Sequence, residues 1–225
     1  MEDILAFLSE LSLNNNREWF NEHKDRYLRC KKLFEAFTAS YIEGLQKIDS
    51  RIGKLSPRDC IWRIYRDVRF SHDKRPYKEW FGTFPAPLSG KRSPMAGYYC
   101  HIQPGQSMFA AGIWGPDNKL LYHLRSDIND NGEELEQIMN KREFKKLFRD
   151  FDSYYMLKKT PLGFDPKSPY SEWIKRKSFT VSTIFTDEEV CHPNFLQHIL
   201  DVANIAKPLN DFLNYSFEQY IENKE

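Results

Sequence analysis

The side chains best suited to binding chemistry in this 225-residue sequence are cations gathered in residues 58–92. Nine lysines and arginines stand there against four aspartates and glutamates, a local excess of five. The whole chain has a net charge of only +1, which leaves a net charge of −4 on the rest. Cations concentrated in a near-neutral chain are more typical of an anion site than of an evenly solvated surface, so this segment is the first candidate for function.

Six side chains of this segment are predicted to hold and position an anion: Arg63, Arg69, Lys74, Lys78, Tyr65 and Tyr77. Arginine suits this role because its planar guanidinium group binds two oxygens at once. The alternative is that the charges form structural ion pairs that hold a loop in place, such as Arg66 with Asp67 and Lys74 with Asp73. The sequence leaves both interpretations open.

The local structure of residues 58–70 decides which of these side chains lie together. We favour a strand, because β-favouring residues are frequent here, and a strand would place Arg63 and Arg69 on one side, lining a concave pocket. A helix that begins at Ser56–Pro57 is the alternative. In the strand, Arg66 falls on the apolar face, so we expect it to be structural and paired with a buried carboxylate or with backbone carbonyls.

Three side chains are candidates for catalysis: His23, Asp67 and Ser71. His23 lies among aromatic residues of a predicted helix, where a core histidine is the ordinary explanation and proton transfer to the Arg63–Arg69 face is the functional one. The arginines beside Asp67 would lower its pKa and make it a poor general base. Ser71 is a loop residue without a Gly-x-Ser-x-Gly elbow around it. These residues therefore do not define a reaction.

The sequence contains no recognisable metal or cofactor motif. Its six histidines form no His-x-x-x-His pair, and its four cysteines are far apart with no Cys-x-x-Cys pair, so they are expected to be reduced thiols. The fragment Gly90–Ser93 lacks the spacing of a phosphate loop and has Arg92 where a magnesium-binding Ser or Thr should stand. No metal is expected, and any cofactor is unknown.

The first 48 residues are predicted to be helical. An apolar stripe over residues 4–11 ends at three asparagines, of which Asn15 and Asn16 are expected to be structural. With Asn15 as the cap, Glu18 stands three residues on, as in a capping box. Aromatic residues then recur every seven positions and predict one long helix with a single aromatic seam: Phe20, Tyr27, Phe34 and Tyr41.

Alternation replaces helical spacing in the middle of the chain. Residues 98–102 and 107–114 flank Pro104–Gly105, which suits a type II turn, so a hairpin is expected. Further elements are predicted: a helix over 119–149, a strand over 179–185, a helix opened by a capping box at Thr186 and Glu189, and a helical tail over 195–221 that is bent or split near Pro208. The result is an α+β fold with a mainly antiparallel central sheet packed by N-terminal and C-terminal helices.

This length and composition predict a single domain over residues 1–225. Its parts are a helical N-terminal part at about 1–48, a central sheet at about 58–116, and a helical and mixed remainder. With no leader-like N-terminus and no apolar run long enough to span a membrane, a cytoplasmic protein without a membrane partner is expected. Residues 85–97 lack apolar periodicity and are expected to form a mobile surface loop, with a lid over a bound anion as one hypothesis.

Several stretches resemble an uncharacterised family of small bacterial and fungal conserved hypothetical proteins that carry a domain of unknown function. They are NNNREWF at 14–20, RIYRDVRFS at 63–71, DKRPYKEWF at 73–81, AGYYCHIQPG at 96–105, and the downstream LGFD and KSFTVS. The resemblance runs over nearly the whole chain and implies no reaction, cofactor or substrate. It identifies motif positions rather than catalytic residues: Asn15, Asn16, Arg17, Trp19, Phe20, Arg63, Arg66, Asp67, Arg69, Phe70, Ser71, Asp73, Lys74, Pro76, Tyr77 and Lys78.

Three functions compete for this sequence. The first is recognition of a phosphorylated or carboxylated small molecule through a basic, aromatic-lined pocket, with or without catalysis. The second is binding of single-stranded nucleic acid, with Tyr65, Phe70, Tyr77 and Trp80 stacking on bases, although the near-zero net charge and the lack of a known module argue against it. The third is a protein-interaction module without catalysis. The oligomeric state and the enzymatic status stay open.

Overall fold

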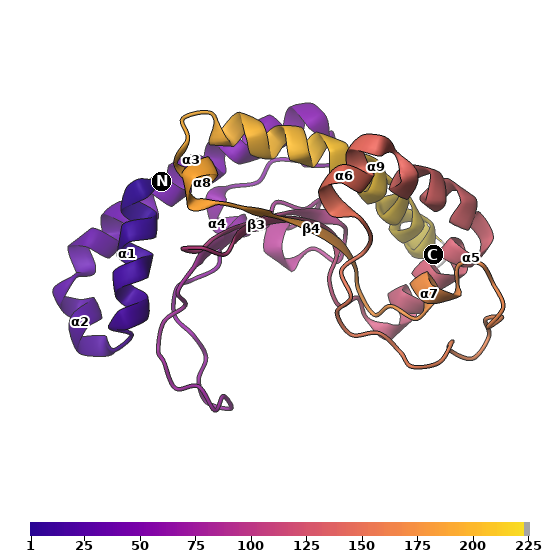
Figure 1. Ribbon diagram of the computed structural model, residues 1–225, viewed down its shortest axis with the longest axis horizontal. Helices are drawn as coiled ribbons and strands as arrows, with labels where there is room; N and C mark the ends of the chain where they lie inside the picture. Colours follow the sequence, from indigo (N-terminus) through magenta and orange to yellow (C-terminus); the bar gives the residue numbers. More distant parts are fainter. Residues whose placement is uncertain (223–225) are drawn as a thin grey trace. The chain divides into compact units, whose positions relative to one another are not determined.

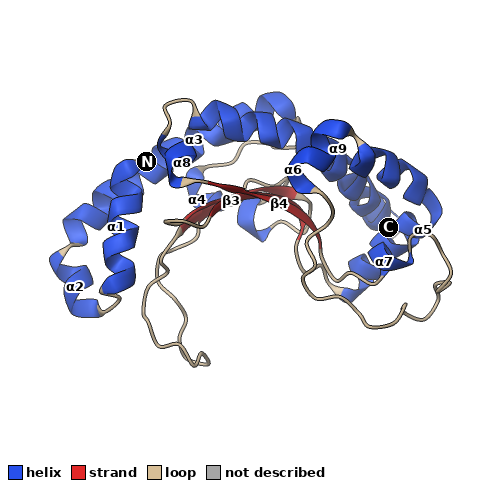
Figure 2. Cartoon of the chain, viewed as in Figure 1, coloured by secondary structure: helices blue, strands red, loops and turns tan. Residues whose placement is uncertain are grey.

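A computed structural model describes residues 1–222 and shows helices around a central antiparallel sheet, an α+β fold as predicted (Figure 2). Four strands make up the sheet in the described chain, in the order β1-β2-β3-β4: Phe81–Thr83, Gly97–Ile102, Ser107–Ile113 and Phe179–Phe185. The first two strands are antiparallel, with Gly82 opposite His101.

The helices of the described chain are α1 Glu2–Leu13, α2 Arg17–Glu22, α3 Lys24–Ile48, α4 Pro57–Cys60, the 3₁₀ turn η1 Gly90–Arg92, α5 Asn118–Asn140, α6 Arg142–Phe148, α7 Ser171–Ile174, α8 Asp187–Cys191 and α9 Phe195–Glu222 (Figure 1). Across residues 1–222, no helix is both long enough and apolar enough to cross a membrane. Helical residues therefore dominate both ends of the sequence, and strands its middle.

The chain divides into two compact units. Unit 1 contains residues 1–92, 99–109 and 184–201, and unit 2 contains residues 93–98, 110–183 and those from 202 onward. Strands β2, β3 and β4 and helix α9 contribute residues to both units. The single domain expected from chain length stays a prediction.

The core of unit 1 is built on the predicted aromatic seam. Phe20, Tyr27, Phe34 and Tyr41 are all buried. Phe20 stacks on Tyr77 with ring centroids 3.9 Å apart, and Phe34 stacks on Phe81 of β1 at 5.3 Å. Such pairs contribute about 0.5–1.5 kcal/mol each beyond the apolar area they bury. The seven-residue spacing therefore predicted the core face of this region.

The single long helix predicted for this region is wrong in one respect, because the chain breaks between α2 and α3. His23 has φ −102° and ψ 18°, outside the helical range, and serves as the end of α2 and the start of α3. The cap of α2 is Asn16, whose side chain accepts a hydrogen bond from the Trp19 backbone, rather than Asn15. Asn15 is instead occupied by a contact with residues 77–79, which no local pattern reveals.

The predicted hairpin of β2 and β3 is present. Gly105 has φ +70°, as the third residue of a type II turn requires, and the Gln106 amide donates to the Gln103 carbonyl at 3.0 Å. Tyr98, Cys100 and Ile102 are buried, as the alternation predicted.

Other predicted elements are also present, with corrected ends. The helical stretch after residue 118 is divided into α5 and α6 at Lys141, and the Thr186–Glu189 capping box opens α8. Helix α9 runs through Pro208 as one helix, so of the predicted bend or split the split is absent. In unit 2, Asn214 of α9 bonds both the amide and the carbonyl of Ala96, which anchors the helix beside the start of β2.

The prediction that residues 85–97 bury little is wrong. Pro85, Ala86, Met95 and Ala96 are buried although they follow no period. In unit 1, η1 lies against α4, where the Lys91 ammonium group donates to the Arg58 carbonyl. The lid itself stays a prediction.

Replacing Gly112 by alanine should lower the free energy of unfolding by about 3 kcal/mol or more. Gly112 has φ +119°, and an added Cβ would lie 2.0 Å from the Phe179 carbonyl oxygen, so backbone would have to move. Gly105→Ala is the matched control, because Gly105 has φ +70° with open space around it and should cost about 1 kcal/mol. Urea denaturation measures both, and equal losses would contradict the close approach.

Candidate functional site

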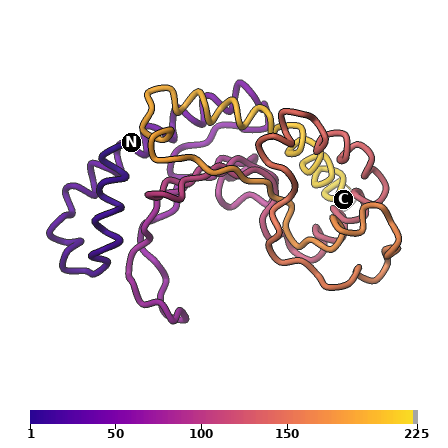
Figure 3. The backbone as a smooth tube through the Cα atoms, in the orientation of Figure 1, coloured from indigo at the N-terminus to yellow at the C-terminus, as the bar shows by residue number. Residues whose placement is uncertain are grey.

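The segment in which the cations gather is neither the favoured strand nor the alternative helix. The Ser56–Asp59 capping box and Pro57 do open a helix, but α4 ends at Cys60. The chain then runs out and returns as two limbs held by isolated contacts, such as Tyr65 opposite Tyr77 (Figure 3). Ile64 is buried, but the apolar side of the predicted strand does not continue into the core: Phe70, which a strand would place on the same side as Ile64, is 95% exposed. We call residues 63–78 the basic arm.

Ion pairs neutralise much of the charge of the basic arm. Arg66 pairs with Asp73 at 2.6 Å, Arg69 with Asp67 at 2.6 Å, and Arg75 with Asp73 at 2.7 Å. The hydrogen bonds from Arg75 and Arg66 hold the pKa of Asp73 well below its usual range. Structural ion pairs are therefore present, but between other partners than the sequence suggested.

Arg66 has the acidic partner expected of it, but in a different setting. Its partner Asp73 and its own side chain are both partly exposed, whereas a buried pair was expected. Surface pairs of this kind contribute little to stability. Lys74, which was considered as a partner of Asp73, donates to the Val68 carbonyl at 3.1 Å.

The other predicted anion ligands have varied surroundings. Tyr77 is buried against Phe20, and burial raises its pKa, whereas Tyr65 is partly exposed. The Lys78 ammonium group lies 4.7 Å from the centre of the Trp80 ring. Burial, together with the positive charge of Arg63, lowers the pKa of Lys78. Common binding of one anion by this set stays a prediction.

The three catalytic candidates make local contacts. His23 stacks on Trp19 with ring centroids 4.1 Å apart, and its Nδ1 lies 2.8 Å from the Trp19 carbonyl oxygen. The hydrogen bond from Arg69 lowers the pKa of Asp67, which weakens it as a base. Ser71 donates its backbone amide to Val68. No catalytic role follows from these contacts.

A polar chain on β2 was missed by the sequence analysis. The Tyr99 hydroxyl lies 2.6 Å from Nδ1 of His101, and Nε2 of His101 lies 2.8 Å from Oε1 of Gln103. Tyr99 and His101 alternate along β2 and so share a face, and Gln103 continues the alternation just beyond its end, which the sequence could have revealed. Trp80 packs on His101 at 5.0 Å. Burial raises the pKa of Tyr99 and lowers that of His101, so both are held neutral.

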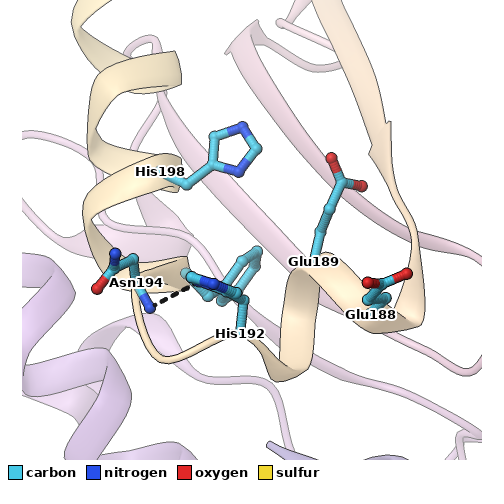
Figure 4. Close-up of a pocket in the computed structure, with 6 residues that line it drawn as sticks. Glu188, Glu189, His192, Asn194 and His198 are labelled. Atoms are coloured by element: carbon cyan, nitrogen blue, oxygen red, sulfur yellow. Dashed lines mark hydrogen bonds between the residues drawn. The ribbon is translucent and has the colours of Figure 1, made fainter.

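Unit 1 also has a pocket of about 270 Å³ where α8 meets the start of α9 (Figure 4). Figure 4 shows Glu188 and Glu189 on α8 and His198 on α9, with His192 in the turn between them. The Glu189 carboxylate caps α8 by accepting from Thr186, and His192 accepts from the Asn194 amide. No group of three metal-binding side chains occurs in the described part of the chain. Two of the polar groups here are therefore already used within the protein.

Unit 2 has a larger pocket with a different character. Its volume is about 390 Å³, and it is lined by Trp114, Gly115, Pro116, Asn118, Leu121, Arg125, Tyr155, Leu157, Lys177 and Ser178. Two of these described lining residues are cations and none is an acid. The nearest acid in sequence, Asp117, uses its side chain to cap α5 by accepting from the Lys119 and Leu120 amides.

Arg125 is the unusual residue of this pocket. Its side chain is 7% exposed, and one terminal nitrogen donates to the Arg176 carbonyl at 2.8 Å. Its Nε is buried without a hydrogen-bond partner, and the described residues provide no carboxylate for it. Burial alone lowers the pKa of Arg125. A buried charge without a counter-ion is costly, and an anion in the pocket would remove that cost.

Arg176, which is equally buried, also has an Nε without a hydrogen-bond partner, but its charge has a carboxylate nearby. It lies 3.3 Å from the Asp150 carboxylate and donates to the Asp152 carbonyl at 2.7 Å. Burial lowers the pKa of Arg176, while nearby carboxylates oppose the shift. Arg176 thus has its counter-ion within the chain, and Arg125 does not.

The sequence analysis missed the pocket of unit 2. Its lining comes from three stretches that are far apart in the sequence, 114–125, 155–157 and 177–178. The sequence of each stretch alone predicts only a turn, a helix or a loop. The run Lys175–Arg176–Lys177 was a usable signal of local charge. The burial of Arg125 was not visible, because an arginine on a helix is ordinarily exposed.

Comparison with known proteins adds one finding. A family model described as "Conserved hypothetical protein (DUF2461)" matches residues 3–212. No curated protein and no solved structure matches the chain.

Acidification from pH 7.5 to 5.5 should lower the melting temperature of the wild-type protein more than that of His101→Gln. Because burial lowers the pKa of His101 below its unfolded value of about 6.5, the folded chain binds fewer protons than the unfolded chain. Stability is therefore lost as the pH falls through that value. The comparison of the two proteins cancels the other histidines, and equal losses would show that His101 titrates normally.

Asn15→Ala should lower the free energy of unfolding by about 1–3 kcal/mol, because it leaves partners in the arm unsatisfied. The Asn15 side chain donates to the Tyr77 carbonyl and to Glu79, and accepts from the Tyr77 amide. Asn14→Ala is the control, since Asn14 bonds only its own helix at an exposed position. Chemical denaturation measures both, and a loss no larger than the control's would mean that the arm does not depend on Asn15.

Proposed function

Since this chain belongs to the conserved hypothetical protein family DUF2461, whose description assigns no reaction, we propose a function from its geometry: unit 2 binds the anionic group of a small molecule in the pocket around Arg125. The function class is the one that the sequence suggested, and its location is new. Whether binding leads to catalysis stays open.

The observation that carries the proposal is the buried guanidinium group of Arg125. It has one carbonyl partner, a free Nε and no carboxylate among the described residues, and it lines an open pocket. A chain that needed this arginine only for structure would pair it as it pairs Arg176. A planar guanidinium group with free donors suits a carboxylate or phosphate group.

Neighbouring groups support an anion in the same place. Lys177 is exposed at the pocket and has no carboxylate partner in the described chain, so it adds a second positive charge. The Ser178 oxygen accepts from the Gly115 amide, which leaves its own proton for a ligand oxygen. Asn118 adds an amide donor at the start of α5. Together these groups provide one charged and two neutral hydrogen-bond donors around one cavity.

The basic arm remains the alternative location for anion binding. Its predicted ligands Arg63, Arg69, Lys74 and Lys78, with Tyr65 and Tyr77, are a second proposal for the same function. The pairing of Arg66, Arg69 and Arg75 with acids makes it the weaker one, because an incoming anion would have to displace a carboxylate. Single-stranded nucleic acid stays a further alternative there, favoured by the exposed Phe70 ring beside the Arg69 guanidinium group.

Arg125→Met should abolish anion binding while changing the melting temperature of the free protein little. Methionine fills much of the arginine volume and removes a buried charge that has no counter-ion, which offsets the loss of the hydrogen bond to the Arg176 carbonyl. Inorganic phosphate and acetate, each in a concentration series, are the probes in a thermal-shift assay. When the anion is present at one hundred times its dissociation constant, the wild-type protein should gain about 2.7 kcal/mol of stability. The variant should gain none.

Two matched variants locate the site and identify the cost of losing an arginine. Arg69→Met removes an exposed cation from the basic arm and should leave the anion response intact. Arg176→Met removes a paired buried arginine and should lower the melting temperature. If Arg69→Met loses the thermal shift and Arg125→Met keeps it, the anion site lies in the basic arm. If neither phosphate nor acetate shifts the melting temperature of the wild-type protein, the proposal is wrong.

A further inference from the structure

We infer that the ligand of the unit 2 pocket is an anion that carries a flat aromatic ring, with the ring against Trp114 and the anionic group at Arg125. This inference rests on the proposed function and adds the class of ligand. Three features carry it: the size of the pocket, the exposed indole, and the backbone conformation of Tyr155.

The pocket is larger than a simple anion requires. Its volume of about 390 Å³ lies within the range of small-molecule sites, roughly 300–1,000 Å³. A carboxylate or phosphate group at Arg125 would leave most of this space empty. Much of the remaining lining is apolar and comes from Pro116, Leu121 and Leu157, so the rest of the ligand is apolar too.

Trp114 provides an exposed indole surface at the pocket. Neither of the two tyrosines described beside it stacks face to face on this surface. Its side chain is 57% exposed. Tyr154 and Tyr155 lie with ring centroids 5.5 and 5.9 Å from it, but their planes are inclined at 64° and 74° to the indole. Neither ring stacks in parallel on Trp114, which leaves that position for a ligand ring. Aromatic side chains exposed together in this way mark binding surfaces.

Tyr155 holds a conformation that a non-glycine residue rarely adopts. Its φ is +55°, in the left-handed region, although its side chain is exposed and gains little by burial. Strain of this kind persists where the surroundings impose it, and it is frequent at ligand sites. The strained backbone holds the Tyr155 ring beside Trp114, at the pocket.

One strip of backbone fixes the aromatic wall relative to the guanidinium group. Met156, next to Tyr155, forms an isolated β-bridge with Arg176, and the Leu157 amide donates to the Lys175 carbonyl at 2.8 Å. The Arg176 carbonyl also accepts the hydrogen bond from Arg125. Arg176 therefore supports both the segment that carries Tyr155 and the guanidinium group of Arg125. This shared support fixes the distance between the two parts of the pocket that one ligand would contact.

Two kinds of molecule share this chemistry, an aromatic carboxylate and a nucleoside monophosphate. The experiment compares each with a partner of equal charge that lacks the aromatic ring, by isothermal titration calorimetry. The pairs are benzoate with cyclohexanecarboxylate, and adenosine monophosphate with ribose 5-phosphate. In at least one pair, the aromatic member should bind at least tenfold more tightly, and the pair that does so identifies the anionic group.

Trp114→Leu tests the place of the ring. It should remove the preference by weakening the aromatic member to the level of its partner, while the non-aromatic member binds as before. Phe70→Leu is the matched control, because Phe70 is also an exposed aromatic residue but belongs to the basic arm of unit 1, so the preference should remain.

The remaining outcomes separate this inference from the proposed function. Equal binding of both members of each pair, lost in Arg125→Met, would overturn the ring and leave the anion site standing. A preference that survives Trp114→Leu or is lost in Phe70→Leu would also overturn the inference. Binding of no member of either pair to the wild-type protein would overturn both.

Discussion

A buried polar group without a partner is costly, and this constraint holds the irregular parts of the chain in place. Long segments of the protein have few ladder hydrogen bonds of their own, and side chains from turns, loops and helices supply the missing partners. Asn15 bonds both backbone groups of Tyr77 at the base of the basic arm, and Asn214 does the same for Ala96 before β2. Arg176 bonds the Asp152 carbonyl in the long loop of unit 2. These contacts replace regular secondary structure as the source of local order.

The same constraint applies to Arg125, whose buried charge has no carboxylate partner in the described chain. Other buried polar atoms of the described chain also lack a partner, among them Nε of Arg176 and the hydroxyl groups of Thr38 and Ser216. The charge of Arg176 is balanced by Asp150, and the two hydroxyl groups are neutral, so these cost less than a charge without a counter-ion. Arg125 combines a charge, deep burial and an opening to a cavity, and it is this combination that points to a ligand rather than to a packing defect.

The basic arm shows why a count of charges is an incomplete guide to a binding site. The excess of cations in residues 58–92 is real, yet Asp67 and Asp73 accept bidentate or shared hydrogen bonds from the arginines around them. Composition records how many charges are present and not which of them are paired. The pocket of unit 2 has only two cations in its described lining, but none of its described lining residues is an acid.

The sequence alone determined the features that depend on residues a few positions apart. The aromatic seam of α2 and α3, the hairpin with its turn at Gly105, and the Thr186–Glu189 capping box were predicted, because periodicity and capping are local. The tertiary structure alone decided the course of residues 61–80, the partner of Asn15 and the burial of Arg125. Each of these depends on distant groups: Arg125, for example, bonds a carbonyl 51 positions further along the chain. Burial and pairing are set only when such distant segments meet, so no local pattern could have shown them.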